Sequence, residues 1–166
     1  MYIHTMNQPG LEPRSGIVSL PCACANLRRA ARIVTQRYDQ ELQPADIKAT
    51  QFTLLQALAR VGNISQGALG DLLGLDSTTL TRTLALLRRK RWIQTKPGKD
   101  RRQVRLTLTA AGRHKYLSVL PYWHSAQKQL RRVLGEADWK QMMESTTLTA
   151  ALALCAPCPP GARLRR

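Results

Sequence analysis

Residues 65–112 constrain the fold more than any other part of the chain, because the spacing of their apolar residues changes partway along. Leucines recur at helical spacing after Ser65 and again after Asp76, and both of these residues are favourable helix N-caps. Gly74 lies between the two helical patterns, at a position where helices commonly end. After Trp92 apolar and polar residues alternate around a Pro-Gly turn, which indicates a β-hairpin.

The same stretch carries most of the positive charge of the protein. Between Arg82 and Arg105 there are ten lysines and arginines and one acidic residue, Asp100, so nine of the sixteen net positive charges lie there. Charge concentrated in this way is expected to bind a polyanion. Nucleic acid is the favoured partner, with an acidic protein or a membrane surface as the alternatives.

The remaining residues predict helices on both sides of this stretch. Apolar residues at helical spacing precede Pro44 and Gly62, which are expected to close the first two helices. Thr109 is expected to cap a long helix, Pro121 to kink it, and Gly135 to separate it from a last helix. The predicted order is α-α-α-α-β-β-α-α. The fold class is mainly α with a small β-wing, a winged helix-turn-helix flanked by N- and C-terminal helices.

The chain divides by composition into a body and two ends. At 166 residues and 43% hydrophobic it fits one globular domain with a sizeable core. Five leucines are expected to pack the helix-turn-helix: Leu69, Leu72, Leu80, Leu84 and Leu87. The predicted parts are a flexible arm over 1–20, helical flanks over 21–46 and 110–155, a winged helix-turn-helix over 47–109, and a basic irregular tail over 156–166.

The second helix of a helix-turn-helix presents its N-terminal residues to base edges in the major groove. The candidate base contacts here are Ser77, Thr78, Thr79 and Arg82. Arginine can bind guanine through two hydrogen bonds, and a threonine methyl can contact the thymine methyl. The run Arg88–Arg91, with Arg88 and Arg89 as its first members, follows at the helix end, where phosphate contacts are expected. A solvated basic face is the alternative for this run taken alone, and the basic hairpin after it weakens that alternative.

Three segments resemble the MarR family of bacterial transcription regulators. IKATQFTLLQALA resembles the second helix of the family, and LGDLLGLDSTTLTRTLALLRRKRWI resembles its helix-turn-helix. KDRRQVRLTLTAAGR is similar to its wing, in which Asp-Arg-Arg is followed by L-x-L-T-x-x-G. The resemblance covers Ile47–Gly112 and extends more loosely over 21–155. The wing motif is its most specific part.

The resemblance implies a homodimer whose first, fifth and sixth helices interleave, so that 21–46 and 110–155 form the dimerisation region. It also implies that the two recognition helices enter successive major grooves of a pseudo-palindromic operator in double-stranded DNA. Asp100 would pair with a nearby arginine, and Arg101 or Arg102 would reach a narrow minor groove, where negative potential is focused. The wing residues implied to contact DNA are Lys99, Asp100, Arg101 and Arg102.

The resemblance further implies repression that a small aromatic or phenolic acid relieves. No cofactor is expected to be required. Such an effector acts only if it binds the DNA-incompetent arrangement more tightly than the competent one. Six residues are candidates for the effector site, with core packing or a solvated face as the alternative for each: Arg28, Arg32, Tyr38, His114, Tyr116 and Trp123.

The four cysteines form two close pairs, Cys22 with Cys24 and Cys155 with Cys158. In a cytoplasmic protein, close pairs indicate redox or metal sites more readily than structural disulfides. The family topology would bring the two pairs into one region of a dimer, where thiolates could bind zinc or another soft metal ion. The other hypotheses are oxidant sensing by a thiol near a helix N-terminus and ordinary packing.

Other classes of protein fit the sequence less well. None of the three histidines lies in an H-E-x-x-H motif, and the sequence has neither G-x-S-x-G nor a phosphate-binding glycine loop, so it predicts no enzyme. No apolar run approaches the roughly 20 residues that span a bilayer, and the first 20 residues lack the apolar core of a signal peptide. A cytoplasmic location without membrane partners is therefore expected. A nucleic-acid-binding protein that uses charge alone remains the rival.

Overall fold

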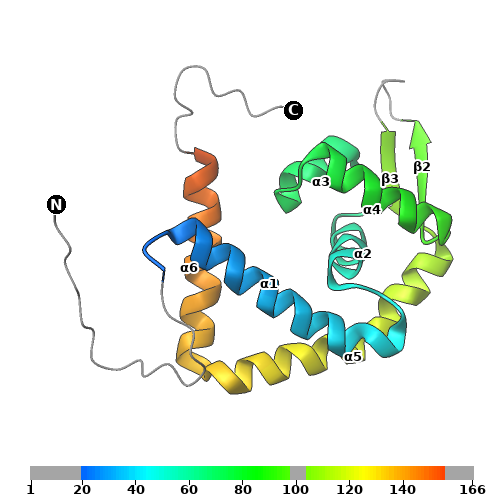
Figure 1. Ribbon diagram of the computed structural model, residues 1–166. Coiled ribbons are helices and arrows are strands. Elements are labelled where there is room, and N and C mark those ends of the chain that lie inside the picture. The colour runs from blue at the N-terminus through cyan, green and yellow to red at the C-terminus, as the bar shows by residue number, and fades with distance from the viewer. Residues whose placement is uncertain (1–19, 98–103, 156–166) are drawn as a thin grey trace. The chain divides into compact units, whose positions relative to one another are not determined.

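A computed structural model describes residues 20–97 and 104–155 of the chain. Its helices are α1 (Ala23–Leu42), the 3-10 helix η1 (Gln43–Ala45), α2 (Ala49–Val61), α3 (Gln66–Leu73), α4 (Ser77–Arg89), α5 (Ala110–Leu134) and α6 (Glu136–Cys155). Its strands are β1 (Ile64–Ser65), β2 (Ile93–Pro97) and β3 (Val104–Leu108) (Figure 1). One compact unit ends at Val34 and a second begins at Thr35. The predicted mainly α fold with a small β-wing is confirmed.

Side chains near the helix starts provide the caps, as the sequence predicts. Ser65 Oγ accepts a hydrogen bond from the Ala68 amide at 3.2 Å, and Asp76 Oδ1 accepts one from the Thr79 amide at 2.9 Å. Thr109 Oγ1 caps α5 in the same way. These bonds satisfy amides that have no partner inside the first turn of a helix.

The end of α3 and the start of α2 depend on two further residues. Gly74 ends α3 in the left-handed region at φ +60°, which favours glycine. The start of α2 has a cap that the sequence does not suggest, because Asp39 on α1 accepts a hydrogen bond from the Ala49 amide at 2.7 Å.

The sheet has the strand order β1-β3-β2, and both of its pairings are antiparallel. Ile93 lies opposite Leu108, Pro97 lies opposite Val104, and the two long strands run side by side next to α4 (Figure 1). The sequence predicts β2 and β3 as a hairpin. It does not predict β1, whose two residues carry no periodicity of their own and which forms only by pairing with β3.

The described core is built by α2, α3, α4, the sheet and α5. Its fully buried leucines include Leu55 on α2, Leu69 on α3 and Leu84 on α4. The expectation that Leu72 packs the fold is wrong, because 55% of its surface is exposed. The buried face of α3 is formed by Leu69 and Gly70, and at about 100° per residue Leu72 lies off that face.

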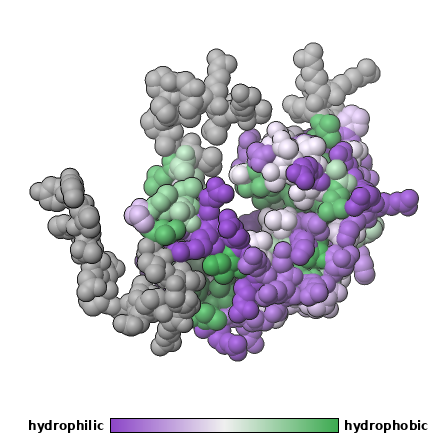
Figure 2. All heavy atoms as spheres, viewed as in Figure 1, coloured by the Kyte–Doolittle hydropathy of each residue, from purple (hydrophilic) through white to green (hydrophobic). Residues whose placement is uncertain are grey.

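Helices α5 and α6 continue the chain beyond the sheet. α5 runs through Pro121, and Figure 1 shows it changing direction between its yellow-green first part and its yellow second part. Gly135 then separates it from α6, as expected. Every described side chain from Met143 to Ala153 is exposed, and Figure 2 shows apolar residues gathered over this part of α6. Within the described ranges, no helix has the length and apolarity to cross a membrane.

Candidate DNA-binding surface

Helix α4 has one buried face and one polar face. Leu80, Leu84 and Leu87 are buried, with exposed fractions of 2% or less. At about 100° per residue, Thr78, Arg82 and Arg89 lie on the opposite face, and all three are exposed. The helix therefore presents two arginines and a threonine outward while its leucines hold it in the core.

The first turn of α4 is fixed by Asp76. Its Oδ2 accepts a hydrogen bond from Thr79 Oγ1 at 2.7 Å, in addition to the amide bond to its Oδ1. The amide and hydroxyl of Thr79, in that order, lower the pKa of Asp76 below its ordinary value. The hydroxyl proton of Thr79 is thus used inside the protein, while its methyl group and oxygen stay on an exposed residue. Ser77 and Thr78 are exposed beside it.

Thr81 belongs to the same surface, and the sequence reasoning missed it. It is exposed, and its Oγ1 accepts a hydrogen bond from Gln66 Nε2 at 3.0 Å. This bond ties α3 to α4 and leaves the Thr81 hydroxyl able to donate outward. The helical period could have identified it, since it lies four residues after Ser77 on the same side of α4.

The structure divides the basic run Arg88–Arg91, which begins in the last turn of α4. Arg88 and Arg89 are exposed in the last turn of the helix. Lys90 instead directs its ammonium to Asp46 at 3.0 Å, with 30% of its side chain exposed. Lys90 is therefore paired within the protein, and the phosphate contact by this run stays a prediction. The carboxylate of Asp46 has a lowered pKa, first because of this hydrogen bond and then because of the Lys90 charge.

The stem of the wing, formed by β2 and β3, is basic on one side. In the antiparallel register Lys96 lies directly opposite Arg105, and Arg105 lies opposite Ser65 of β1. Like charges in directly opposite positions destabilise a strand pair. An anion bound over this pair would relieve their repulsion. The predicted wing-tip residues Lys99, Asp100, Arg101 and Arg102 lie outside the described residues.

The wing is attached to α5 through the residues that the L-x-L-T-x-x-G motif specifies. Thr109 Oγ1 donates to the Arg91 carbonyl at 2.7 Å, and the Thr109 amide donates to the Trp92 carbonyl at 3.0 Å. Arg91 itself adopts φ +57°. Gly112 lies so close that an added Cβ would sit 1.8 Å from the Trp92 oxygen. Thr109 and Gly112 thus fix the first turn of α5 against the chain between α4 and β2.

The six candidate effector residues lie in different surroundings. Tyr116 stacks on buried Phe52 with ring centroids 5.7 Å apart, and Trp123 lies 6.2 Å from the same ring, so both pack against the core. Tyr38 is partly buried, which raises its pKa, and His114 is exposed. Arg28 and Arg32 are exposed in the unit that ends at Val34.

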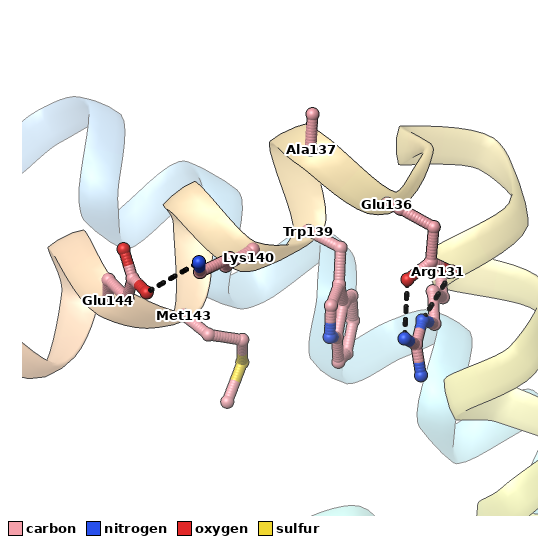
Figure 3. A pocket seen from close by; sticks show the side chains of 7 residues that line it. All are labelled: Arg131, Glu136, Ala137, Trp139, Lys140, Met143 and Glu144. Atoms are coloured by element: carbon pink, nitrogen blue, oxygen red, sulfur yellow. Dashed lines mark hydrogen bonds and ion pairs between the residues drawn. The ribbon is translucent and has the colours of Figure 1, made fainter.

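Two open pockets occur where α5 meets α6. One, of about 420 Å³, is lined by Trp123, His124, Gln127, Lys128, Arg131 and Trp139. The other, of about 540 Å³, is shown in Figure 3 with the ion pair between Arg131 and Glu136 at its edge. That pair spans Gly135 and lowers the pKa of Glu136. Gln127 Oε1 is buried without a hydrogen-bond partner in the described residues.

Cys22 and Cys24 are exposed free thiols at the start of α1. Cys155 is the last residue of α6, and Cys158 lies outside the described residues. Residues 20–97 and 104–155 contain no group of three or more histidine, cysteine, aspartate or glutamate side chains that could hold a metal ion.

Comparison with known proteins places this arrangement in a family. A sequence profile of the MarR family matches residues 45–103. The uncharacterized HTH-type transcriptional regulator YwoH of Bacillus subtilis is 27% identical over 90 residues, 54% of this chain and 66% of that protein, just under two thirds of its length.

Solved structures extend the likeness to both flanks of the winged helix. The transcriptional regulator MosR of M. tuberculosis, solved in complex with DNA, is 31% identical, with a TM-score of 0.74 over 82% of this chain and 99% of that chain. MepR of S. aureus, solved as a DNA complex, shares the fold at 22% identity and a TM-score of 0.67, over 78% of this chain and 97% of that one. With its helix-turn-helix, its wing motif and these likenesses, the chain belongs to the MarR family of transcription regulators.

Proposed function

We propose that the protein is a regulator that binds double-stranded DNA in a sequence-specific manner, as a homodimer on a pseudo-palindromic operator. The exposed polar face of α4 carries the proposal, because a helix capped at Asp76 and held by buried leucines can present its first turns to base edges. The 31% identical relative MosR has been solved in complex with DNA, which supports the same partner here. The protein acts by binding and not by catalysis, and it acts in the cytoplasm.

The exposed residues of α4 differ in their proposed DNA contacts according to their distance from the helix N-terminus. Arg82 reads a guanine through two hydrogen bonds, and Ser77, Thr78, Thr79 and Thr81 supply hydroxyl and methyl contacts to neighbouring bases. Arg88 and Arg89 follow at the C-terminal end of the helix and bind phosphate oxygens. Because phosphate contacts carry no sequence information, Arg82 and Arg89 have separable roles although they share one face.

The wing provides the second DNA contact. Arg101 or Arg102 enters the minor groove, Asp100 orients the arginine, and Lys99 adds positive charge at the tip. The stem contributes Lys96 and Arg105, whose mutual repulsion a phosphate group would relieve.

The homodimer forms through the helical flanks, residues 21–46 and 110–155. The exposed side chains of α6 support this, since a face with Leu148 and Leu152 exposed at 59% and 61% needs a partner to cover it. Two recognition helices in one dimer bind two half-sites, so the operator is a pseudo-palindrome.

The decisive experiment selects duplex DNA from a randomised pool with the full chain. Affinity is then measured for the selected duplex and for an unrelated duplex of equal length. Arg82→Ala is expected to lose about 1–3 kcal/mol of binding free energy per half-site on the selected duplex, and little binding free energy on the unrelated duplex. Its matched control, Arg89→Ala, is expected to lower the affinity for both duplexes by the same factor.

The salt dependence of binding separates specific recognition from binding by charge alone. A sequence-specific dimer keeps its preference for the selected duplex as salt rises, whereas a charge-only binder loses all duplexes together. Equal affinity for both duplexes at every salt concentration would contradict the proposal.

Effector control is proposed at two places, each with its own test. The open pocket at Trp123, with Lys128 and Arg131 in its lining, suits a small aromatic acid. Titration of the protein's tryptophan fluorescence with benzoate tests this, because Trp123 and Trp139 both line the pocket. The exposed thiols of Cys22 and Cys24 suit an oxidant, or a soft metal ion together with Cys155 and Cys158. DNA affinity of wild type and Cys24→Ser before and after mild peroxide tests the thiols, and identical behaviour of the two proteins removes the redox role.

A further inference from the structure

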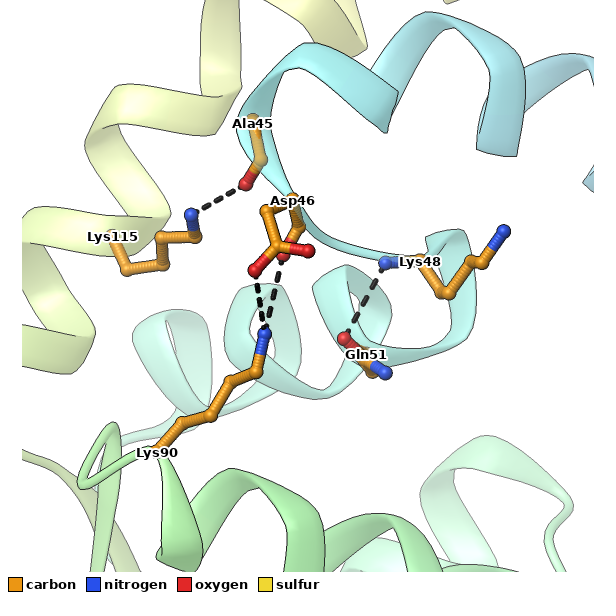
Figure 4. A network of polar contacts seen from close by, with 6 residues as sticks. All are labelled: Ala45, Asp46, Lys48, Gln51, Lys90 and Lys115. Atoms are coloured by element: carbon orange, nitrogen blue, oxygen red, sulfur yellow. Dashed lines mark hydrogen bonds and ion pairs between the residues drawn. The ribbon is translucent and has the colours of Figure 1, made fainter.

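Lys90 is engaged in a polar contact that ties the end of α4 to the joint between η1 and α2 (Figure 4). Its Nζ lies 3.0 Å from Asp46 Oδ2 and 3.4 Å from the Asp46 carbonyl oxygen. Asp46 adopts φ +43°, and its amide donates to the Gln43 carbonyl at 2.9 Å. A single ammonium group thus contacts both the side chain and the backbone of a residue 44 positions earlier in the chain.

A second lysine reaches the same joint from α5. Lys115 Nζ donates to the carbonyl of Ala45, the neighbour of Asp46 (Figure 4). The ammonium groups of Lys90 and Lys115 lie 4.7 Å and 5.0 Å from the centroid of the Trp92 ring, close enough for cation–π attraction. The end of α4, the η1 joint and α5 therefore meet around one carboxylate and one indole ring.

We propose that Lys90 is a positioning residue that fixes the orientation of α4 through Asp46, and that it does not bind phosphate. The inference rests on the proposed DNA-binding function, which it deepens. Lys90 follows directly on Arg89, so its tether limits rotation of the helix about its axis. Rotation would turn Thr78, Arg82 and Arg89 away from the groove. Loss of the tether leaves a smaller fraction of the protein in the binding-competent arrangement, and apparent affinity falls by that fraction.

Removing the charge of Asp46 distinguishes the two possible roles of Lys90, phosphate binding and positioning of α4, because they predict opposite changes in DNA affinity. If Lys90 bound phosphate, Asp46 would compete with DNA for it, and removal of the carboxylate would tighten DNA binding. Asp46→Asn also raises the net charge of each subunit by one, which favours DNA for a second reason. If Lys90 positions α4, the same substitution weakens binding. Asparagine tolerates the left-handed backbone as aspartate does, so the substitution removes charge without strain.

The experiment measures affinity of the full chain for the selected duplex. Asp46→Asn and Lys90→Gln are each expected to weaken binding about two- to fivefold, because the Asp46 side of the ion pair is exposed to solvent. The double variant is expected to be no weaker than either single one, because both break the same contact. Lys90→Arg keeps the affinity, since a guanidinium can still pair with the carboxylate. The matched control Asp71→Asn, at an exposed residue of α3, makes the same charge change and is expected to bind DNA equally or more tightly.

The salt dependence of DNA affinity provides a second measurement, because it changes when a phosphate contact is lost. Each lost contact lowers the slope of log affinity against log salt by about 0.9, so Arg89→Gln is expected to lower it by about 1.8 per dimer and Lys90→Gln to leave it unchanged. Equal slopes for these two variants, or tighter binding by Asp46→Asn, would overturn the proposal.

A measurement without DNA keeps the inference separate from the proposed function. Amide hydrogen exchange at residues 86–92 is expected to be faster in Asp46→Asn than in the wild type and in Asp71→Asn. If the wild type shows no preference for the selected duplex, the proposed function fails by itself. Unchanged exchange in Asp46→Asn would show that Asp46 does not hold the end of α4.

Discussion

Gly112 is a residue at which one added carbon atom tests how the wing is attached to α5. The Cβ of Gly112→Ala would lie 1.8 Å from the Trp92 oxygen and 2.7 Å from its carbonyl carbon, both backbone atoms. The first turn of α5 must move away, so the free energy of unfolding is expected to fall by about 1–3 kcal/mol or more. Chemical denaturation at a fixed protein concentration measures the change.

Gly67→Ala is the matched control for this substitution. A Cβ at Gly67 meets nothing within 4 Å, and this glycine lies inside α3. Alanine is the better helix former, by up to about 1 kcal/mol, so this variant is expected to be as stable as the wild type or more stable. A Gly112→Ala protein with wild-type stability would mean that the α5 attachment is looser than the described contacts require.

Asp76 makes the N-terminal cap of α4 dependent on pH. Its pKa is lowered in the folded protein, so its carboxylate stabilises the fold above its unfolded pKa of about 4. That contribution is lost as the pH falls through the lower folded pKa. The Tm of Asp76→Ala is therefore expected to lie well below that of the wild type at pH 7, and the difference in Tm is expected to be smaller at pH 3.

Ser65→Ala removes the equivalent cap from α3 without removing a charge. Its difference from wild type in Tm is expected to be the same at both pH values. A pH-independent gap for Asp76→Ala would show that the carboxylate acts at this cap only as a neutral acceptor.

At the scale of elements, the β2–β3 hairpin carries a pair of like charges that lowers its stability and that would favour the proposed DNA binding. Lys96 faces Arg105 across the strands, and this pair costs stability in the free protein. Lys96→Glu turns the pair into an attractive one. It is expected to raise the free energy of unfolding by about 0.2–1 kcal/mol and to weaken binding to every duplex.

Lys96→Gln separates the two effects in this hairpin, because it removes the repulsion without adding attraction. Its stability and its DNA affinity are both expected to lie between those of wild type and Lys96→Glu. Lower stability of Lys96→Glu than of the wild type in denaturation experiments would be incompatible with the observed register.

The elements that the sequence predicts are those whose causes are local. The caps at Ser65, Asp76 and Thr109 bind amides three residues later, and such spacing is visible in the chain itself. Strand β1 is not predictable in this way, because it forms only by pairing with β3, about forty residues later.

The same limit applies to the candidate site. The place of Arg82 near the start of the helix and of Arg89 in the basic run predicts both as contacts. Neither reveals the pairing of Lys90 with Asp46, which depends on how distant segments fold together. A run of basic residues in a sequence does not reveal which of them the protein itself neutralises.

At the scale of the whole molecule, the winged helix has its own buried core and α6 does not. The buried leucines of α2, α3 and α4 come from one chain, whereas α6 leaves its C-terminal half exposed. A subunit without its partner is therefore expected to keep the winged-helix fold. In the proposed homodimer, the partner would add a second α4 and would cover α6.

Leu148→Asp combined with Leu152→Asp tests this division, because the two leucines lie four residues apart on one side of α6. A charge at each position is expected to convert the dimer to a monomer in analytical ultracentrifugation, with helical circular dichroism largely retained. Each monomer then holds one half-site, so affinity for the selected duplex is expected to fall about 100-fold or more. Leu72→Asp is the matched control, since Leu72 is exposed to a similar extent, 55%, but lies on α3. It is expected to remain dimeric, and a dimeric double variant would place the subunit interface elsewhere than on α6.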